Sequence, residues 1–298
     1  NMTKIAIIGA GLSGLSAAHF LKDYVEITLF EKACSVSGRI STRYACPYFF
    51  DHGAQYFTVR TRTFHDFIQP LISQGIIERW SPRYLKFDSD KIIERKNWSD
   101  DEPRYVGVPS MNKIAKHLAE GLNVHINTRI VSLKRGNTWQ LTDESGQLYS
   151  DFDWVISTAP SPQAVAVLPK KFKYYDDIKD VEMRACFSLM LGFSKNIPLE
   201  FEAAHVIHSD ISWIAVNSHK PGRTDRFTLM VHSSEEYSEA HIDDDRETVM
   251  QHLMNETSNV IGHDVSIADY KTVHGWRYAN NAKRENFHIF LDPDLKLA

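Results

Sequence analysis

The chain has 298 residues, of which 43% are hydrophobic, and a formal net charge of −4 at pH 7. This length and apolar content favour one large or two interleaved domains over a small disulfide-stapled module. The charge balance, without a basic run interleaved with aromatics, argues against a nucleic-acid partner. The three cysteines are odd in number and lack C-x-x-C pairing, which favours a reducing compartment and a cytoplasmic location. Beyond the opening run no apolar stretch approaches the length of a membrane span, so we expect no membrane partner.

The opening residues carry a dinucleotide-binding pattern. The apolar run 5–8 is typical of a buried strand, and Gly9, Gly11 and Gly14 follow it as G-x-G-x-x-G before apolar residues recur at helical spacing over 12–21. At such a strand-to-helix turn, the first glycine permits the tight turn and the second lets backbone approach a pyrophosphate. The third allows close packing of helix and strand, and the helix N-terminus offers free N–H groups to phosphate.

A second alternating strand is predicted at 25–29, and Glu31 stands just beyond it. An acidic side chain at this place accepts the ribose hydroxyls of a dinucleotide and repels a 2′-phosphate, so the sequence favours FAD or NAD over NADP. The competing interpretation is a secretory signal, because Lys4 precedes an apolar run. The glycine spacing and the acid in register argue against that interpretation.

The remaining pattern predicts helices at 63–75, 110–122 and 243–262, an exposed hairpin or loop at 88–104, a three-stranded meander within 123–160, and an antiparallel sheet from about 166 onward. Ser110 is expected to cap the second helix, and Asp244 with Glu247 stands at capping-box spacing in the third. The predicted fold class is α/β. A Rossmann-type FAD/NAD(P)-binding domain (1–62, 105–165, 275–298) is interleaved with an antiparallel-sheet α+β substrate domain (63–104, 166–274).

Several short motifs in fixed order give the sequence a family resemblance. Ser37-Gly38-Arg39 follows Glu31 and is similar to the G-G-R signature of the flavin amine-oxidase superfamily, with serine in place of the first glycine. The segments DHGAQYFTVR, VGVPSMNKIAKHL, VISTAPSPQA, SHKPGR and HGWRYA then follow in order along nearly the whole chain. Together they resemble the bacterial renalase-like branch of that superfamily.

The resemblance implies noncovalent FAD. It places Ser13 and Glu31 at the adenosine and phosphate half, Arg39 at the pyrophosphate, and Gln55 and Tyr56 at the flavin ring. Val131, expected in the middle strand of the meander, would face the adenine. The full expected FAD set is Gly9, Gly11, Ser13, Gly14, Glu31, Lys32, Gly38, Arg39, Gln55, Tyr56, Val131 and Thr158.

The activity that the resemblance implies is oxidation of the 2- and 6-dihydro isomers of NAD(P). Hydride passes to the flavin, and O2 reoxidises the flavin to give H2O2. Because the flavin does the difficult step and the protein orients the donor carbon, no catalytic dyad or triad is expected. The candidates for the substrate site are His232, Tyr56, Trp276 and Arg277. For each of them a packing or ion-pairing role is the competing interpretation.

Two other functions stay open at this point. The first is a flavin oxidase acting on small amines, with Tyr56, Trp276 and Tyr278 as an aromatic cage. The second is FAD or nucleotide binding without turnover. In the family that the sequence resembles, a Gly-Asp motif and a flavin-facing helix would follow the residues LKLA, so we expect the C-terminal part of the FAD domain to be truncated here. No metal site is expected, because His205 and His208 would point to opposite faces of one strand.

Overall fold

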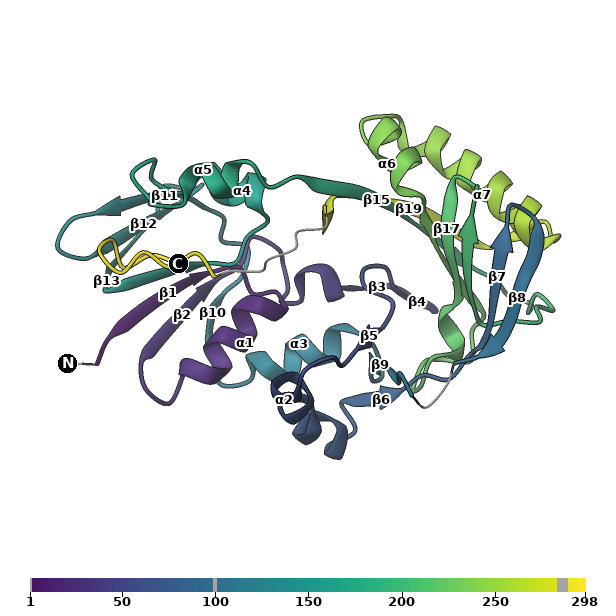
Figure 1. The fold of residues 1–298 in the computed structure, drawn as a ribbon, viewed down its shortest axis with the longest axis horizontal. Coiled ribbons are helices and arrows are strands. Elements are labelled where there is room, and N and C mark those ends of the chain that lie inside the picture. The colour runs from purple at the N-terminus through teal and green to yellow at the C-terminus, as the bar shows by residue number, and fades with distance from the viewer. Residues whose placement is uncertain (1, 99–100, 283–288) are drawn as a thin grey trace. The chain divides into compact units, whose positions relative to one another are not determined.

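The computed structural model describes residues 2–98, 101–282 and 289–298, and Figure 1 traces their fold. The chain divides into two compact units, each built from separated stretches. Unit one comprises Asn1–Arg39, Ala115–Met183 and Asn280–Ala298, and unit two comprises Ile40–Ile114 and Arg184–Ala279. Both units are discontinuous, like the predicted domains, but each boundary between the units lies at a different residue from the predicted domain boundary. The stretch after residue 39 groups with unit two because its strands pack there: a Cβ on Gly192 would lie 2.6 Å from the ring of Tyr48.

Unit one contains a parallel sheet in the order β10-β2-β1-β14. Its elements are β1 (Lys4–Ile8), α1 (Leu12–Leu21), β2 (Glu26–Phe30), β10 (Asn123–His125) and β14 (Trp154–Ser157). Residues such as Ile7 and Leu29 are fully buried, as strands covered on both faces require. The strand-glycine-helix-strand order confirms the Rossmann-type prediction.

A separate three-stranded antiparallel sheet in unit one has the order β11-β12-β13. Its strands are β11 (Ile130–Arg135), β12 (Trp139–Asp143) and β13 (Leu148–Phe152), followed in the chain by α4 (Ser161–Val165) and α5 (Tyr175–Lys179). The meander is confirmed, and Asp143 fixes its second turn by accepting from the backbone N–H of Ser145 and Gln147. Two details were wrong. The predicted outer segments also contain β10 and β14 of the parallel sheet, and Val131 lies on an edge strand, not the middle one.

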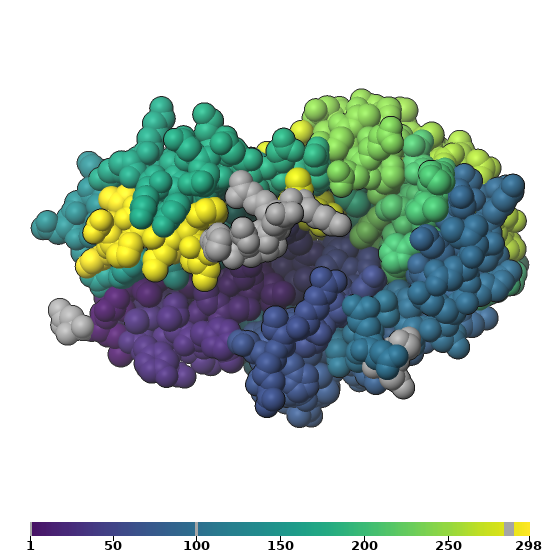
Figure 2. Space-filling view, viewed as in Figure 1, coloured from purple at the N-terminus to yellow at the C-terminus, as the bar shows by residue number. Residues whose placement is uncertain are grey.

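Residues 289–298 belong to unit one and are seen at its surface in yellow in Figure 2. Leu297 is completely buried and forms a parallel bridge with Val155 of β14. The indole N–H of Trp139 donates to the carbonyls of Leu295 and Lys296, at 3.1 Å each. These bonds tie the last residues to both sheets of unit one.

Unit two is dominated by a seven-stranded sheet in the order β19-β15-β18-β17-β16-β7-β8. The strands are β7 (Arg83–Asp88), β8 (Lys91–Asn97), β15 (Met183–Gly192), β16 (Ala203–Ile207), β17 (Ile211–Val216), β18 (Thr228–Ser233) and β19 (Tyr270–Asn281). Among the strand pairs of this sheet with a described register, only β7 with β16 is parallel. The predicted antiparallel sheet is confirmed, and the predicted hairpin at 88–104 contributes its edge strand β8.

Helices α6 (Glu235–His241) and α7 (Arg246–Ile261) cover one face of this sheet (Figure 1). Side chains such as Phe187 and Leu253 are fully buried between sheet and helices. The cap of α7 differs from the prediction. Asp245, not Asp244, accepts from the N–H of Thr248, because the carboxylate of Asp244 is engaged by His241 at 2.7 Å.

The rest of unit two consists of short elements: β3 (Thr42–Ala45), β4 (Tyr48–Asp51), β5 (Phe57–Thr58), α2 (Arg62–Ser73), β6 (Ile77–Arg79), β9 (Arg104–Gly107) and the start of α3 (Asn112–Ala119). The helices predicted at 63–75 and 110–122 are present. Ser110 does not cap α3 with its side chain, because its hydroxyl donates to Asn112 instead. Within the described ranges, no helix has the length and apolarity needed to cross a membrane.

Candidate functional site

The N-terminus of α1 is built to receive an anion. Gly11 is its N-cap, with extended backbone and no side-chain cap, and the first intrahelical bond runs from the N–H of Leu15 to the carbonyl of Gly11. The N–H groups of the residues between them therefore have no partner inside the helix. No acidic residue lies in the first turn, and Ser13 is exposed there. This arrangement matches the pyrophosphate site predicted from the glycine spacing.

The three glycines of the motif differ in what a side chain would meet. Gly9 has φ +103°, and a Cβ on it would lie 2.6 Å from Oγ1 of Thr158. A Cβ on Gly14 would lie 2.0 Å from the carbonyl oxygen of Gly9. The fold itself thus requires these two glycines. At Gly11 the nearest atom would be Cα of Gly38 at 3.7 Å, an ordinary contact, so the protein leaves room that a close-lying ligand can use.

Glu31 follows β2 and is 6% exposed. One carboxylate oxygen accepts from the N–H of Ala10 and the other from the N–H of Ala33, both at 2.8 Å. A carboxylate oxygen can accept more than one hydrogen bond, so a ribose hydroxyl can still be bound. Glu31 therefore also holds the glycine turn in place, a structural role that the sequence analysis did not include.

The segment Ser37 to Arg39 lies against the glycine turn. Ser37 forms a parallel bridge with Gly11, and its φ of +146° is a conformation that favours glycine. Gly38 has φ +54°, and a Cβ on it would come within 3.1 Å of Cα of Gly11. Ser37 therefore occupies the position of the first glycine of the signature with a strained backbone. Arg39 is exposed beside this turn, as a phosphate ligand requires.

Three other predicted FAD residues lie in unit one with different surroundings. The hydroxyl of Thr158 donates to the carbonyl of Ile8 at 2.9 Å, so it stabilises the end of β1, where the turn to α1 begins. The Nζ of Lys32 donates to the side chain of Gln163 at 3.0 Å. Val131 is 43% exposed and falls at an irregularity in the pairing of β11 with β12. Their contacts with FAD stay predictions.

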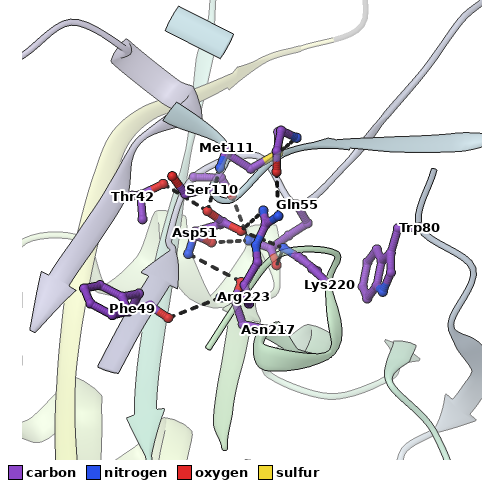
Figure 3. A network of polar contacts seen from close by, with 12 residues as sticks. Thr42, Phe49, Asp51, Gln55, Trp80, Ser110, Met111, Asn217, Lys220 and Arg223 are labelled. Carbon is purple, nitrogen blue, oxygen red and sulfur yellow. Dashed lines mark hydrogen bonds and ion pairs between the residues drawn. The ribbon is translucent and has the colours of Figure 1, made fainter. Parts of the chain in front are cut away.

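Asp51 is the centre of a buried polar network in unit two (Figure 3). One oxygen accepts from the N–H of Met111 and from the hydroxyl of Thr42, both at 2.9 Å. The other lies 2.6 Å from Nη2 of Arg223 and 3.5 Å from Nζ of Lys220. Burial alone would raise the pKa of Asp51, but the two cations and the backbone donor outweigh it and hold the pKa below its usual value. The carboxylate is therefore ionised and joins four segments of the chain.

Gln55 extends this network. Its amide nitrogen donates to the carbonyls of Asp51 and Gly53 at 2.6 and 3.1 Å. Its amide oxygen accepts from Nε1 of Trp213 at 3.3 Å and from Nζ of Lys220 at 3.2 Å. Burial lowers the pKa of Lys220 to about 8, although Asp51 acts to raise it. All these bonds lie inside unit two, and the predicted contact of Gln55 with the flavin stays a prediction.

Tyr56, half-buried, belongs to an aromatic cluster. Its ring centroid lies 4.9 Å from that of Trp98 and 5.6 Å from that of Trp213. The guanidinium of Arg104 lies 4.2 Å from the ring centroid of Trp98, in a cation–π contact. Trp98 and Trp213 are buried, so the accessible part of the cluster is the half-buried ring of Tyr56, with the positive charge of Arg104 beside it. Of the predicted site residues it contains only Tyr56.

His232 and Trp276 belong to a second cluster, which also contains His52 and His274. The ring of His52 lies 5.2 Å from those of His274 and Trp276, and His274 and Trp276 are 4.5 Å apart. The indole N–H of Trp276 and the hydroxyl of Ser188 both donate to the carbonyl of His52, at 2.9 and 2.6 Å. The structure therefore brings the motifs DHGAQ and HGWRYA together with strand β18, which carries His232.

The imidazoles of this cluster are neutral at pH 7. Burial, then the neighbouring His274 and Arg43, lower the pKa of His52 to about 3. Burial followed by Lys220 lowers the pKa of His232 to about 4, against a small opposing effect from the carbonyl of His52. Burial and Arg43 likewise lower the pKa of His274 to about 4. The cluster is thus uncharged and lies in a positive field. The sequence analysis missed His52 and His274, although both stand inside motifs that carry the family resemblance.

Arg277 is separated from this cluster. Neighbouring residues of a strand point to opposite faces, so Arg277 and Trp276 project to opposite sides of β19. The guanidinium of Arg277 is paired with the exposed carboxylate of Asp243, which also raises its pKa. The pair with Asp243 is the competing interpretation given for Arg277, and its contact with the substrate stays a prediction.

The glycine turn, the acid after β2 and the sheet-based second unit define a dinucleotide-binding oxidoreductase fold. A sequence profile described as "NAD(P)-binding Rossmann-like domain" matches residues 7–71, and one described as "Flavin containing amine oxidoreductase" matches residues 83–287. The chain therefore belongs to the flavin-containing amine oxidoreductase family. Members are FAD-dependent oxidoreductases, and FAD is the cofactor that the unit-one turn fits.

Individual relatives agree with this assignment. Mouse renalase is 23% identical over 176 residues, which cover 54% of this chain and 48% of renalase. The match thus spans about half the length of that curated relative. The solved structures of a putative protoporphyrinogen oxidase from Exiguobacterium and of a putrescine oxidase double mutant are similar in fold. Their TM-scores are 0.76 and 0.70 and their identities 11% and 12%, over 95% and 92% of this chain and 88% and 85% of theirs.

Proposed function

We propose that this protein is an FAD-dependent oxidase of isomeric dihydronicotinamide dinucleotides, which uses O2 as the second substrate and yields H2O2. The observation that carries the proposal is the uncharged cluster of His52, His232, His274 and Trp276 in a positive field. A dihydronicotinamide is a neutral planar ring attached to a pyrophosphate. Its ring suits neutral imidazoles and indole, and its negative charges suit the nearby Arg43.

The residues of the chain would bind and orient the substrate. Bound FAD supplies the hydride acceptor and the route for electrons to O2. The indole of Trp276 is fixed by its bond to the carbonyl of His52, so its ring presents a preset surface to a planar donor. Because the imidazoles stay neutral, they neither attract a carboxylate nor pair with an ammonium ion. The glycine turn and Arg39 of unit one would hold the pyrophosphate of the cofactor.

Oxidation of small amines is the second candidate function. The aromatic cluster of Tyr56, Trp98 and Trp213 supports it, because such rings can enclose an amine. A hydride donor of this class must be the neutral amine. The guanidinium of Arg104 lies beside these rings and disfavours an ammonium ion, so this candidate predicts activity that rises with pH toward the pKa of the free amine.

The decisive experiment is anaerobic mixing of the FAD-loaded protein with each donor class. We expect 2- or 6-dihydro-NAD(P) to bleach the flavin absorbance in a single turnover, and admission of O2 to restore it with formation of H2O2. Ordinary 4-dihydro-NAD(P)H is the control for nonspecific reduction. Bleaching by small amines alone would establish the second candidate instead. A stable flavin complex that neither donor class reduces would show binding without turnover and would refute both.

A further inference from the structure

We propose that His52 and His232 recognise the carboxamide group of the nicotinamide and so select substrates that carry it. This inference rests on the proposed function and goes one step further, because it assigns a chemical group of the substrate to two named side chains.

Each of the two imidazoles has a buried nitrogen without a hydrogen bond. Nδ1 of His52 and Nε2 of His232 have no partner within the described part of the chain. His52 as a whole is only 6% exposed. An unpaired polar atom in such surroundings costs about 1–3 kcal/mol, and two of them occur in one cluster. A ligand that completes both bonds removes this cost.

Neighbouring elements fix the positions of both rings. His232 lies on β18 between Ser188 of β15 and Trp213 of β17 in the strand register. The carbonyl of His52 accepts from Ser188 and from Trp276 of β19, so the backbone at His52 is tied to two strands of the same sheet. The backbone that carries both rings is therefore held in place before any ligand arrives. His232 and Trp276 are half-buried, so the edge of the cluster reaches solvent, although the two unpaired nitrogens are covered.

The chemistry of the unpaired atoms selects among ligand groups. A neutral imidazole nitrogen either donates or accepts one hydrogen bond, depending on the tautomer. The backbone carbonyls of Phe50 and His52 accept from the rings of His52 and His232, which favours the tautomers whose unpaired nitrogens are acceptors. A carboxamide carries two N–H donors without charge, so it can donate to both of these nitrogens. A carboxylate lacks such donors, and an ammonium would meet the field of Arg43. The carboxamide is also coplanar with the nicotinamide ring, and the ring of Trp276 lies beside that of His52 at an angle of 31°.

The test uses NAD+ as a ligand that cannot turn over, because NAD+ is the product of the proposed reaction. The positive field disfavours its pyridinium charge, but the analogue used for comparison carries the same charge, so this effect cancels in the ratio of affinities. Its affinity for the FAD-loaded protein is compared by calorimetry with that of the 3-acetylpyridine analogue, which keeps the carbonyl and lacks both N–H donors. We expect the wild type to bind NAD+ at least about tenfold more tightly, since each unpaired buried acceptor costs about that factor. In His232→Phe, and separately in His52→Phe, the ratio should fall toward one.

Ser188→Ala is the matched control. This change removes the hydrogen bond from Ser188 to the carbonyl of His52 but leaves both unpaired imidazole nitrogens in place. The affinities for NAD+ and for the analogue should therefore change together, and their ratio should stay at the wild-type value. A wild-type ratio near one, or an unchanged ratio in both phenylalanine variants, would overturn the inference while the proposed function stands. If the wild type binds no NAD+ and no dihydro isomer bleaches the flavin, the proposed function itself fails, and this inference fails with it.

Discussion

Replacing Gly11 and Gly14 with alanine one at a time should separate cofactor binding from folding within a single motif. In Gly14→Ala the new Cβ would lie 2.0 Å from the carbonyl oxygen of Gly9 and 3.1 Å from Oγ1 of Thr158. The first contact is with backbone, so the β1–α1 turn must shift. Overpacking of this kind costs roughly 1–3 kcal/mol of unfolding free energy, and the upper end applies here because the obstacle cannot rotate away.

Gly11→Ala should behave differently. Its φ of −79° and ψ of −173° suit alanine, and the nearest atom to the new Cβ lies 3.7 Å away. Loss of glycine as the N-cap costs about 0.5–1 kcal/mol. The methyl group would, however, stand where the pyrophosphate approaches the N-terminus of α1. We therefore expect FAD affinity to fall at least about tenfold, which is about 1.4 kcal/mol.

The assay pairs urea unfolding of the apoprotein with FAD titration followed by fluorescence quenching. Lys22→Ala, on the exposed C-cap residue at the other end of α1, is the control for small changes in the same helix. The reasoning would be refuted if Gly11→Ala kept the wild-type FAD affinity, or if it destabilised the apoprotein as much as Gly14→Ala does.

Three further changes test other parts of the structure. Ser37→Gly should raise the unfolding free energy by about 1 kcal/mol, as judged by urea unfolding, because serine is strained at φ +146°; an unchanged midpoint would contradict this. Acidification from pH 7 to 5 should cost about 4 kcal/mol, because the three cluster histidines have folded pKa values of about 3 or 4, below the unfolded 6.5. The unfolded state binds more protons in that window, so the free energy of unfolding decreases as the pH is lowered. The figure of about 4 kcal/mol is reduced for the partial exposure of the rings. A flat profile of unfolding midpoint against pH would disprove the assignment. Lys220→Met should destabilise by about 1–3 kcal/mol, since the oxygen of Gln55 loses a buried donor while Arg223 still pairs with Asp51. Arg277→Gln, on an exposed pair, should cost below about 1 kcal/mol in the same denaturation assay.

The parts of the fold that the sequence predicts correctly are those in which neighbours along the chain determine the structure. Strand, glycines, helix and second strand follow one another within 32 residues, and each shows its own periodicity. The cap of α7 shows the limit of this approach. Asp244 and Asp245 both suit an N-cap by residue type. The choice between them depends on His241, whose bond to Asp244 leaves Asp245 for the helix.

The polar network and the histidine cluster could not be located from spacing alone. Asp51 meets Lys220 and Arg223 across about 170 residues of chain, and only the folded sheet brings them together. His52 and His274 stand in motifs that the sequence singles out, but their shared surroundings depend on how β4 and β19 pack in unit two. The alternation of β19 was available from the sequence, and it alone separates Arg277 from Trp276.

Polar groups with and without protein partners occur in both units, and those without partners are candidates for ligand contacts. In unit two the carboxylate of Asp51 and the amide of Gln55 are fully engaged by protein partners, so they stabilise the fold. In unit one the N–H groups at the start of α1 have no partner within the helix. The adjacent Gly11 could carry a Cβ without a clash with the protein. Unsatisfied buried atoms are expensive, and folds keep them where a ligand completes them. The unpaired nitrogens of His52 and His232 agree with the ligand site proposed above, because both belong to one cluster of rings in unit two. Gln55 is bonded through both amide atoms, and its contact with the flavin stays a prediction.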